Sequence, residues 1–449
     1  MRRTSKLAVG AAIVAAAVLA LQGCAVVDGS GDDPDTLRVM IGANTTYPEQ
    51  YAQWQRDVAA EFHRKTGADV QFETYASGQE ELTAIQTSVI SGQGPDVYSI
   101  GTTFTPTAYA TGAFVRLTDA DWDAVGGKDR FSAATLGISG PSSSRQIGIP
   151  QHSRPFVMAV NKRILAEHGI TEMPTTWDQL TADARATTGD GTYGLAVAYA
   201  DGFDPWKYVW GMSQNAGNHI VDGSTATIDR PAVQKAYQTY FDWMTKDEVV
   251  DPAAVGWNNS QALAAFADGK AAFFPMTTTT AIPNLDKSPV ANDYEFAVLP
   301  TVPPGADTRP AGGVAAASIL SGDNLVVANY SSAEKQQLAF EFVNEITTAS
   351  AQKHYYELFG DLPTNKTAAG ELAAENPKLA PIVQAGTLSE PTAFTGAWAD
   401  IQLALVNVVT QSIPGLKAGD VSDAALGQRL AAAQKDATGS IQRQKNGGL

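Results

Sequence analysis

The residues of this chain that could do chemistry are aromatic and polar side chains in short segments that look like loops. The aromatic ones are Phe203, Trp206 and Trp210 in ADGFDPWKYVWG, Trp257 in GWNNS, and Trp398 in FTGAWAD. The polar ones follow expected strands, and they are Asn44, Thr45, Gln79, Glu80, Thr102, Thr103 and Arg154. Aromatic rings can cover the C–H faces of a sugar, while amides, carboxylates and guanidinium groups bind its hydroxyls. These residue types therefore predict a binding pocket for a small polar molecule.

Several of these residues have a second interpretation. Trp206 and Trp210 are four residues apart, which is also the spacing of a buried stripe on a helix. Arg154 could instead pair with an acidic neighbour. Trp54 lies on a helical apolar stripe, so we expect it in the core, and we expect Trp177 to pack at a helix start.

Sequence motifs of catalysis are missing from the chain. It contains no G-x-S-x-G, no H-E-x-x-H and no G-x-x-x-x-G-K-[ST], and its five histidines have no ligand spacing. The aspartates of DADWDA (119–124) resemble the start of a calcium loop, but Ala124 and Arg130 replace its glycine and glutamate. We therefore expect no metal site, no cofactor and no enzyme, and we expect the aspartates to cap a turn. Paired carboxylates of glycoside hydrolysis follow no local spacing rule, so a saccharide hydrolase stays an alternative.

The charge of the chain is strongly acidic, with 47 Asp and Glu against 31 Lys and Arg. Nucleic-acid-binding proteins carry a basic patch or stripe, and anionic lipid attracts polybasic segments. The composition therefore predicts a protein that does not bind nucleic acid and does not dock on lipid through a basic surface.

Cys24 is the single cysteine of the chain, so it has no disulfide partner within it. Residues 1–23 have a basic start and a short apolar run, the pattern of a secretory signal peptide. Leu21-Gln-Gly-Cys24 resembles the lipobox of bacterial lipoproteins, in which the cysteine is acylated (palmitate, for example) and becomes the first mature residue. The other interpretation is an ordinary buried cysteine. Residues 24–36 then form a flexible linker with a reach of roughly 20 Å.

The elements that must position the candidate residues alternate along the chain. A strand at 37–41, a helix ending near Gly67, a strand from Val70, a helix at 81–91 and a strand at 96–100 give a β-α-β-α-β start, which predicts a parallel sheet flanked by helices. Further strands are expected at 147–150, 156–160, 193–199, 271–276 and 294–300. Beyond Ser350 the chain reads as helical, with a break at Pro414 among others. So long an α/β chain predicts two lobes.

Seven stretches occur in the order seen in one known family. They are FHRKTGADV (62–70), SGQGPDVY (91–98), AVNK (159–162) followed by PTTWD (174–178), FADGKAA (266–272), AVLP (297–300), FEFV (340–343) and LPT (362–364). The chain resembles extracellular solute-binding protein family 1, the carbohydrate-binding receptors of ABC importers that include maltose-binding protein. The resemblance covers residues 37–449.

The resemblance implies an α/β, two-lobed periplasmic-binding-protein fold of type II, in which each lobe has a mainly parallel sheet and the ligand cleft lies between the lobes. It assigns residues 37–150 and 278–312 to lobe one, and residues 152–276 and 314–449 to lobe two. Hinges are expected at 150–153, at 276–280 and at Gly312-Gly313, and Gly313 is also counted among the ligand-binding residues. By position, Phe203, Trp206 and Trp398 fall where the family stacks aromatic rings on a sugar.

The function that the resemblance implies is a monomeric receptor, lipid-anchored on the extracytoplasmic face of the cell membrane. It would bind a mono- or oligosaccharide and deliver it to the transmembrane subunits of an ABC permease. The alternatives are a binding protein for a polyamine or an anion, where Arg154 matters most for an acidic ligand, and a secreted saccharide hydrolase.

Overall fold

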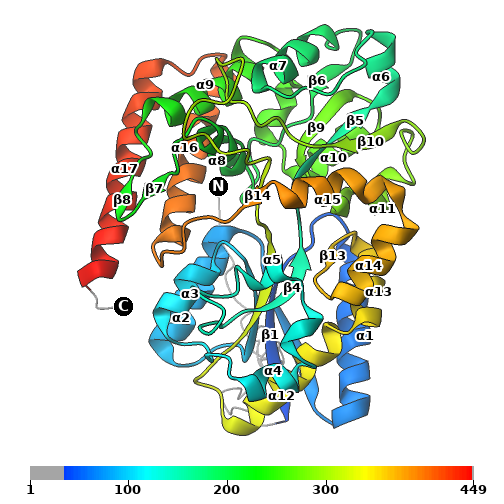
Figure 1. The fold of residues 1–449 in the computed structure, drawn as a ribbon, viewed down its shortest axis with the longest axis vertical. Helices are drawn as coiled ribbons and strands as arrows, with labels where there is room; N and C mark the ends of the chain where they lie inside the picture. The colour runs from blue at the N-terminus through cyan, green and yellow to red at the C-terminus, as the bar shows by residue number, and fades with distance from the viewer. Residues whose placement is uncertain (1–34, 447–449) are drawn as a thin grey trace, which may run out of the picture.

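Two β-sheets organise residues 35–446, the part of the chain that the computed structural model describes (Figure 1). Within these residues the larger sheet has the strand order β13 (Leu362–Pro363), β4 (Ile149–Ser153), β12 (Gly322–Val327), β3 (Val97–Gly101), β1 (Thr36–Gly42) and β2 (Asp69–Tyr75). The smaller sheet has the order β10 (Tyr294–Ala297), β5 (Val157–Asn161), β9 (Ala271–Thr277) and β6 (Tyr193–Leu195). We call the larger sheet with its helices lobe one, and the smaller sheet with its helices lobe two.

Lobe one begins with the β-α-β-α-β unit that the sequence predicts. β1 pairs in parallel with β2 and β3. Along β1, buried residues alternate with partly buried ones, because successive side chains point to opposite faces of the sheet. The helices of this lobe are α1 (Pro48–Thr66), α2 (Gly78–Ser91), α3 (Thr105–Thr111), α4 (Asp119–Ala124), α5 (Ala133–Leu136), α12 (Ala333–Ile346), α13 (Ala349–Phe359) and α14 (Lys366–Glu375). Gly67 ends α1 in the left-handed conformation, and Thr118 with Asp121 forms a capping box on α4, as expected for that aspartate.

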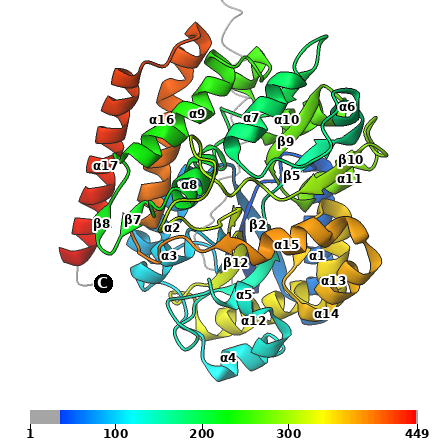
Figure 2. The same cartoon turned by 45° about the horizontal axis from the view of Figure 1, so that its top comes forward.

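Lobe two has its helices on both faces of the four-stranded sheet. They are α6 (Lys162–Glu167), α7 (Trp177–Ala186), α8 (Pro205–Asn215), α9 (Pro231–Thr245), α10 (Asn259–Ala267), α11 (Ile282–Leu285), α15 (Ala380–Thr387), α16 (Trp398–Ala418) and α17 (Asp423–Asn446). The helices α8, α9, α16 and α17 pack together beside the sheet (Figure 2). β6 is shorter than the expected strand 193–199. A two-residue loop joins β7 (Val221–Asp222) and β8 (Thr225–Ala226) into a hairpin, and β8 contacts α17.

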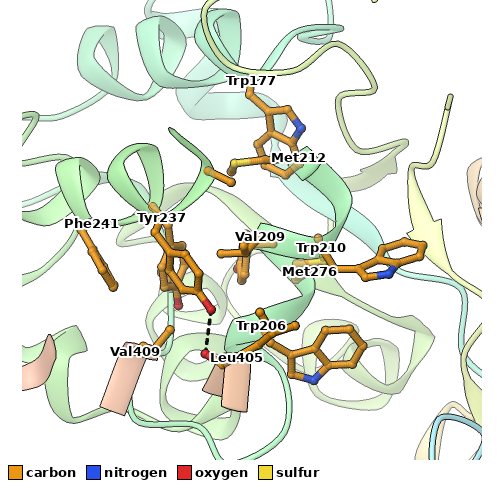
Figure 3. Packing of buried hydrophobic residues seen from close by; sticks show 14 of the residues in the cluster. Trp177, Trp206, Val209, Trp210, Met212, Tyr237, Phe241, Met276, Leu405 and Val409 are labelled. Atoms are coloured by element: carbon orange, nitrogen blue, oxygen red, sulfur yellow. Dashed lines mark hydrogen bonds between the residues drawn. The ribbon is translucent and has the colours of Figure 1, made fainter. Parts of the chain in front are cut away.

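The core of lobe two is rich in aromatic side chains. Figure 3 shows Trp177, Trp206, Trp210 and Tyr237 in one buried cluster, in which the Tyr237 hydroxyl donates a hydrogen bond of 2.7 Å to the carbonyl of Leu405 on α16. α16 continues through Pro414 to Ala418, so the expected break there is wrong. Pro414 removes one backbone hydrogen bond, and the buried face of α16 against α8 and α17 compensates for it.

The chain passes from one lobe to the other at three places. They are residues 154–156 between β4 and β5, residues 320–321 before β12, and residues 376–379 between α14 and α15. After α15, β14 (Ser389–Glu390) pairs with β11 (Ser318–Ile319). The helix α15 leads into β14 and packs on β5 and β10.

The expected ranges of the lobes differ from this division by sheets. Range 278–312, expected in lobe one, contributes β10 to the smaller sheet, where it pairs with β5. Range 314–449, expected in lobe two, contributes β12 and β13 to the larger sheet. The physical reason is packing, since Phe296 lies in a core cluster with Val157, while Leu325 lies in one with Val39.

Candidate functional site

A cavity of about 300 Å³ lies between the two lobes. Lobe one lines it with loops that follow its strands and with the start of α2, and lobe two lines it with the start of α8, the end of β9 and one face of α16. Open α/β sheets usually bind ligands beyond the carboxyl ends of their strands. The cavity therefore has the place and the size of a small-molecule site.

Several of the predicted site residues line this cavity. They are Asn44 and Thr45 after β1, Thr102 and Thr103 after β3, Arg154 after β4, and Phe203 and Trp206 at the start of α8. Phe203 is 36% exposed, whereas Trp206 is almost fully buried and meets the cavity only at its edge. The loops of Asn44 and Thr102 meet because β1 and β3 are parallel neighbours, whose carboxyl ends lie at one edge of the sheet.

The remaining predicted residues lie outside the cavity lining. Trp210 and Trp398 are core residues of lobe two, and the ring of Trp398 packs edge-on against Trp206 with centroids 6.0 Å apart. Trp210 thus follows the buried-stripe interpretation. Trp257 packs against two core clusters. Gly313 lies against α8, where an added Cβ atom would stand 2.3 Å from the carbonyl oxygen of Asn215, so the position has no space for a side chain. The chain passes between the lobes later, at residues 320–321.

Gln79 and Glu80 are also outside the cavity, on the exposed side of α2. The Gln79 amide donates to Thr83, and a Glu80 carboxylate oxygen accepts the N–H of Ala76. The residue that lines the cavity is the next one, Glu81. The predicted residues are thus the exposed neighbours of the one that lines the cavity.

Glu81 is 3% exposed and lies on the same face of α2 as Leu82 and Ile85. Its Oε1 accepts the N–H of Gly101 at 2.8 Å. Burial raises the pKa of Glu81 well above its usual value; the Gly101 N–H opposes this rise, and the negative charge of Asp323 adds to it. The signal that could have found Glu81 is its spacing of four residues from Ile85, because a carboxylate on an apolar stripe points inward.

Arg154 both lines the cavity and pairs with acidic neighbours, so its two interpretations hold together. Its Nη1 lies 2.7 Å from Oδ2 of Asp323, and its Nε donates to Oδ1 of Asp361. Its backbone N–H also donates to the carbonyl of Ser321, at 2.9 Å. Burial favours a higher pKa for Asp323, but Arg154 and then His152 outweigh it and lower that pKa. Arg154 thus links residues 154–156 to residues 320–321, two of the segments where the chain passes between the lobes.

A second charged group holds the loop that carries Phe203. Oδ1 of Asp201 accepts the N–H groups of Phe203 and Asp204, at 2.8 and 3.0 Å, and its Oδ2 accepts the N–H of Asn259 on α10. Asp204 in turn pairs with Lys207, whose ammonium lies over the ring of Phe156. These bonds fix the backbone from which the Phe203 ring projects.

Gln402 on α16 is another cavity residue that the sequence did not reveal. Its side chain is 4% exposed, and its Oε1 has no hydrogen-bond partner among the residues that the structure describes. A buried amide oxygen without a partner costs free energy, so a ligand donor at this position would remove the cost. No local pattern distinguishes Gln402 from other polar residues of a long helix.

The lobes also touch each other at the mouth of the cavity. The hydroxyl of Ser260 on α10 lies 3.2 Å from that of Thr45 and 3.0 Å from that of Thr46. The Tyr47 hydroxyl donates to the carbonyl of Thr280 at 2.7 Å. These contacts bring the first loop of lobe one against lobe two.

Two sheet-centred lobes, joined at several passages of the chain and separated by a lined cavity, define a two-lobed ligand-binding protein. The chain belongs to the bacterial extracellular solute-binding protein family, whose model matches residues 44–353. The predicted family and the predicted two-lobed α/β fold are confirmed. The expectation of mainly parallel sheets is wrong, because both sheets are mixed: β12 is antiparallel to β3 and β4, and β5 is antiparallel to β9 and β10.

One relative resembles the chain in sequence, and solved structures resemble it in fold. The diacetylchitobiose-binding protein DasA of Streptomyces coelicolor is 27% identical over 388 residues, which cover 84% of this chain and 83% of DasA. Maltose-bound MalE3 of T. maritima has a TM-score of 0.73 at 20% identity, with 89% of this chain and 99% of that one covered. The maltotriose-binding protein of Thermus thermophilus has a TM-score of 0.70 at 19% identity, with 90% and 100% covered.

Some predictions fall on parts of the chain that the structure does not describe. The signal peptide 1–23, Cys24 and most of the linker 24–36 lie outside residues 35–446. Among the described helices, none is long and apolar enough to cross a membrane.

Proposed function

We propose that the protein is the solute receptor of an ABC importer, and that it binds a saccharide in the cavity between its lobes without transforming it. The observation that carries the proposal is the composition of the cavity wall. Lobe two supplies the exposed ring of Phe203 and the oxygen of Gln402, which has no hydrogen-bond partner among residues 35–446. Lobe one supplies the polar groups of Asn44 and Thr102. This combination suits a molecule with C–H faces and hydroxyl edges.

The charges in the cavity favour an uncharged ligand over an anion or a polyamine. Arg154 is already bonded to two carboxylates, so it has no free charge to offer an acidic solute. Asp204 is paired with Lys207, and Asp323 and Asp361 share Arg154, so these carboxylates are already bonded to cationic side chains. Saccharides match this balance better than either alternative.

Binding would shift the protein toward the arrangement in which the lobes touch. A ligand that contacts both lobes at once binds that arrangement more tightly than an open one, and this difference in affinity is what drives closure. The permease would then distinguish loaded from empty receptor by the relative position of the lobes.

A thermal-shift panel tests the binding proposal. Its carbohydrates are the saccharides diacetylchitobiose, maltose, maltotriose and α-D-tagatose and the sugar alcohol ribitol, because these compounds appear in the names of a relative and of similar structures. Spermidine and citrate represent the two alternative solute classes. We expect one saccharide to raise the melting temperature and to be recovered unchanged. A shift from spermidine or citrate alone, or conversion of the saccharide to products, would refute the proposal.

We further propose that Cys24 carries the lipid anchor and that the segment 24–36 tethers a monomeric receptor to the extracytoplasmic face of the membrane. Two acyl chains suffice for stable anchoring, and a linker of this length gives roughly 20 Å of reach. Cys24→Ala protein should be released from cells, and its mass should lack the lipid. Variant protein that stays on the cells would contradict the anchor.

A further inference from the structure

We propose that Glu81 takes part in binding as an uncharged carboxylic acid, which donates its O–H to an oxygen atom of the saccharide. The inference rests on the proposed function, because it names the ligand chemistry at one position of the same cavity. It assigns a specificity-determining role to a residue that the sequence did not single out.

The position of Glu81 limits what can stabilise a charge on it. The side chain is 3% exposed and reaches the cavity from the first turn of α2, in contact with the Gly101 N–H. One N–H donor satisfies one of the several lone pairs of a carboxylate. A buried carboxylate needs a cation or further donors, and otherwise its neutral form is favoured.

No cation approaches Glu81 within 4.0 Å among the residues that the structure describes. Arg154, the nearest guanidinium in the cavity lining, is bonded to Asp323 and Asp361. The ionised Asp323 on β12 adds negative potential at Glu81. The surroundings therefore penalise the carboxylate form twice, through burial and through a like charge.

The other polar groups around Glu81 do not change this balance. Tyr75 on β2 lies close to it but donates its hydroxyl to the carbonyl of Ser99, at 2.8 Å. On α2 itself, Glu80 faces away and accepts the Ala76 N–H. Gly101 on β3 contributes the single backbone donor already described. The raised pKa of Glu81 agrees with this arrangement.

A neutral carboxyl selects the ligand group that meets it. It can donate to a hydroxyl, ring or carbonyl oxygen, but it offers an ammonium group no opposite charge. A ligand carboxylate at this position would meet the negative potential of Asp323. The proposal therefore predicts an uncharged saccharide, N-acetylated sugars included, and disfavours sugars with a free ammonium group, uronic acids and polyamines.

The direction of the pH dependence follows from the role as a donor. The protonated form is present below the raised pKa, so affinity is retained there and falls as the pH rises through that pKa. A carboxylate that accepts ligand hydroxyls would give the reverse, with affinity that increases with pH.

The test measures the dissociation constant by calorimetry between pH 5.5 and 9, using the panel saccharide with the largest thermal shift. The proteins are wild type, Glu81→Gln, Glu81→Ala and Glu295→Gln, the last a control at an exposed position on β10. The Glu81→Gln variant keeps an N–H donor for the ligand and an oxygen for the Gly101 N–H. We therefore expect its affinity to lie within about threefold of wild type and not to fall at high pH. Ala removes a buried hydrogen bond, and we expect at least roughly tenfold weaker binding. The control should follow wild type.

The proposal is overturned if Glu81→Gln loses as much affinity as Glu81→Ala, or if wild-type affinity increases with pH. Infrared difference spectra of the ligand-free proteins add a readout that needs no ligand. Wild type minus Glu81→Gln should show the C=O stretch of a protonated carboxyl at pH 7, and a carboxylate band there would refute the inference. If no panel saccharide binds wild type, the proposed function fails, while the infrared result still decides the state of Glu81.

Discussion

The side-chain oxygens of Thr46 and Ser260 lie 3.0 Å apart, although one residue belongs to the first loop of lobe one and the other to α10 of lobe two. This contact joins the lobes beside the loop of Phe203, because Asn259, the neighbour of Ser260, donates its N–H to Asp201. The arrangement of the lobes is thus stabilised by direct contacts as well as by any molecule between them.

Replacing Ser260 with alanine should weaken ligand binding. The variant loses the hydroxyl contacts to Thr45 and Thr46, and a hydrogen bond of this kind contributes about 1 kcal/mol. We expect roughly fivefold weaker binding by calorimetry and an unchanged melting temperature of the ligand-free protein. Ser350→Ala, at an exposed position on α13, is the control. Equal affinity in the two variants would show that the contact does not stabilise the bound state.

Replacing Phe203 with alanine should reduce affinity without reducing stability. The ring is exposed in the cavity, and its loop is fixed by Asp201 rather than by the ring itself. Loss of one stacking face should cost about 1.4 kcal/mol, or tenfold in the dissociation constant. Unchanged binding of every panel saccharide would remove Phe203 from the site.

Replacing Trp398 with alanine should reduce the stability of the protein more than its affinity for the ligand. Its side chain is fully buried beside Trp206, so truncation leaves a cavity in the core of lobe two. We expect the free energy of unfolding to fall by about 3–5 kcal/mol in urea denaturation. Affinity at a temperature where the variant is folded should change much less than in Phe203→Ala. A variant of normal stability that no longer binds would place Trp398 in the site after all.

The ion pair of Arg154 and Asp323 should make the folding stability of the protein depend on pH in the acidic range. The pKa of Asp323 is lowered in the folded protein, so its stabilising charge is fully present above the unfolded value of about 3.9. This contribution is lost as the pH falls through the folded pKa. Asp323→Asn should be less stable than wild type by about 3 kcal/mol at pH 7, with the difference shrinking below about pH 4. A difference that stays constant down to pH 2 would contradict the ion pair.

Gly322 should not tolerate a side chain. It stands at the passage into β12, where a Cβ atom would lie 1.9 Å from the carbonyl oxygen of His152. Gly322→Ala should therefore lower the melting temperature, with a loss of more than about 1 kcal/mol. Gly370 on α14 has open space around its Cα, so Gly370→Ala should stabilise the protein by up to about 1 kcal/mol. Equal melting temperatures for the two variants would refute this description of the passage.

Local patterns predicted the start of the fold because they act over a few residues. The strand and helix periods of residues 36–101 were sufficient to place five elements in order, and glycines such as Gly67 marked their ends. The same patterns located the loops of Asn44, Thr102 and Phe203, since sheet topology brings strand ends together.

The wrong predictions concern contacts between distant residues. The pairing of β10 with β5 depends on which core Phe296 joins, and no local signal contains that information. Trp398 has a loop-like sequence context but begins a buried helix. The choice of Glu80 instead of Glu81 is of another kind, because the apolar stripe of α2 already defined the inward face on which Glu81 lies.

A crystal structure of the protein with the most tightly bound panel saccharide is the most direct test of the account. We predict electron density for one saccharide in the cavity between the lobes, with the ring of Phe203 against a sugar face and the carboxyl of Glu81 within hydrogen-bond distance of a sugar oxygen. Density for the saccharide elsewhere, such as the surface pocket between α1 and α13 near Trp54 and His354, with the cavity holding only water, would contradict it.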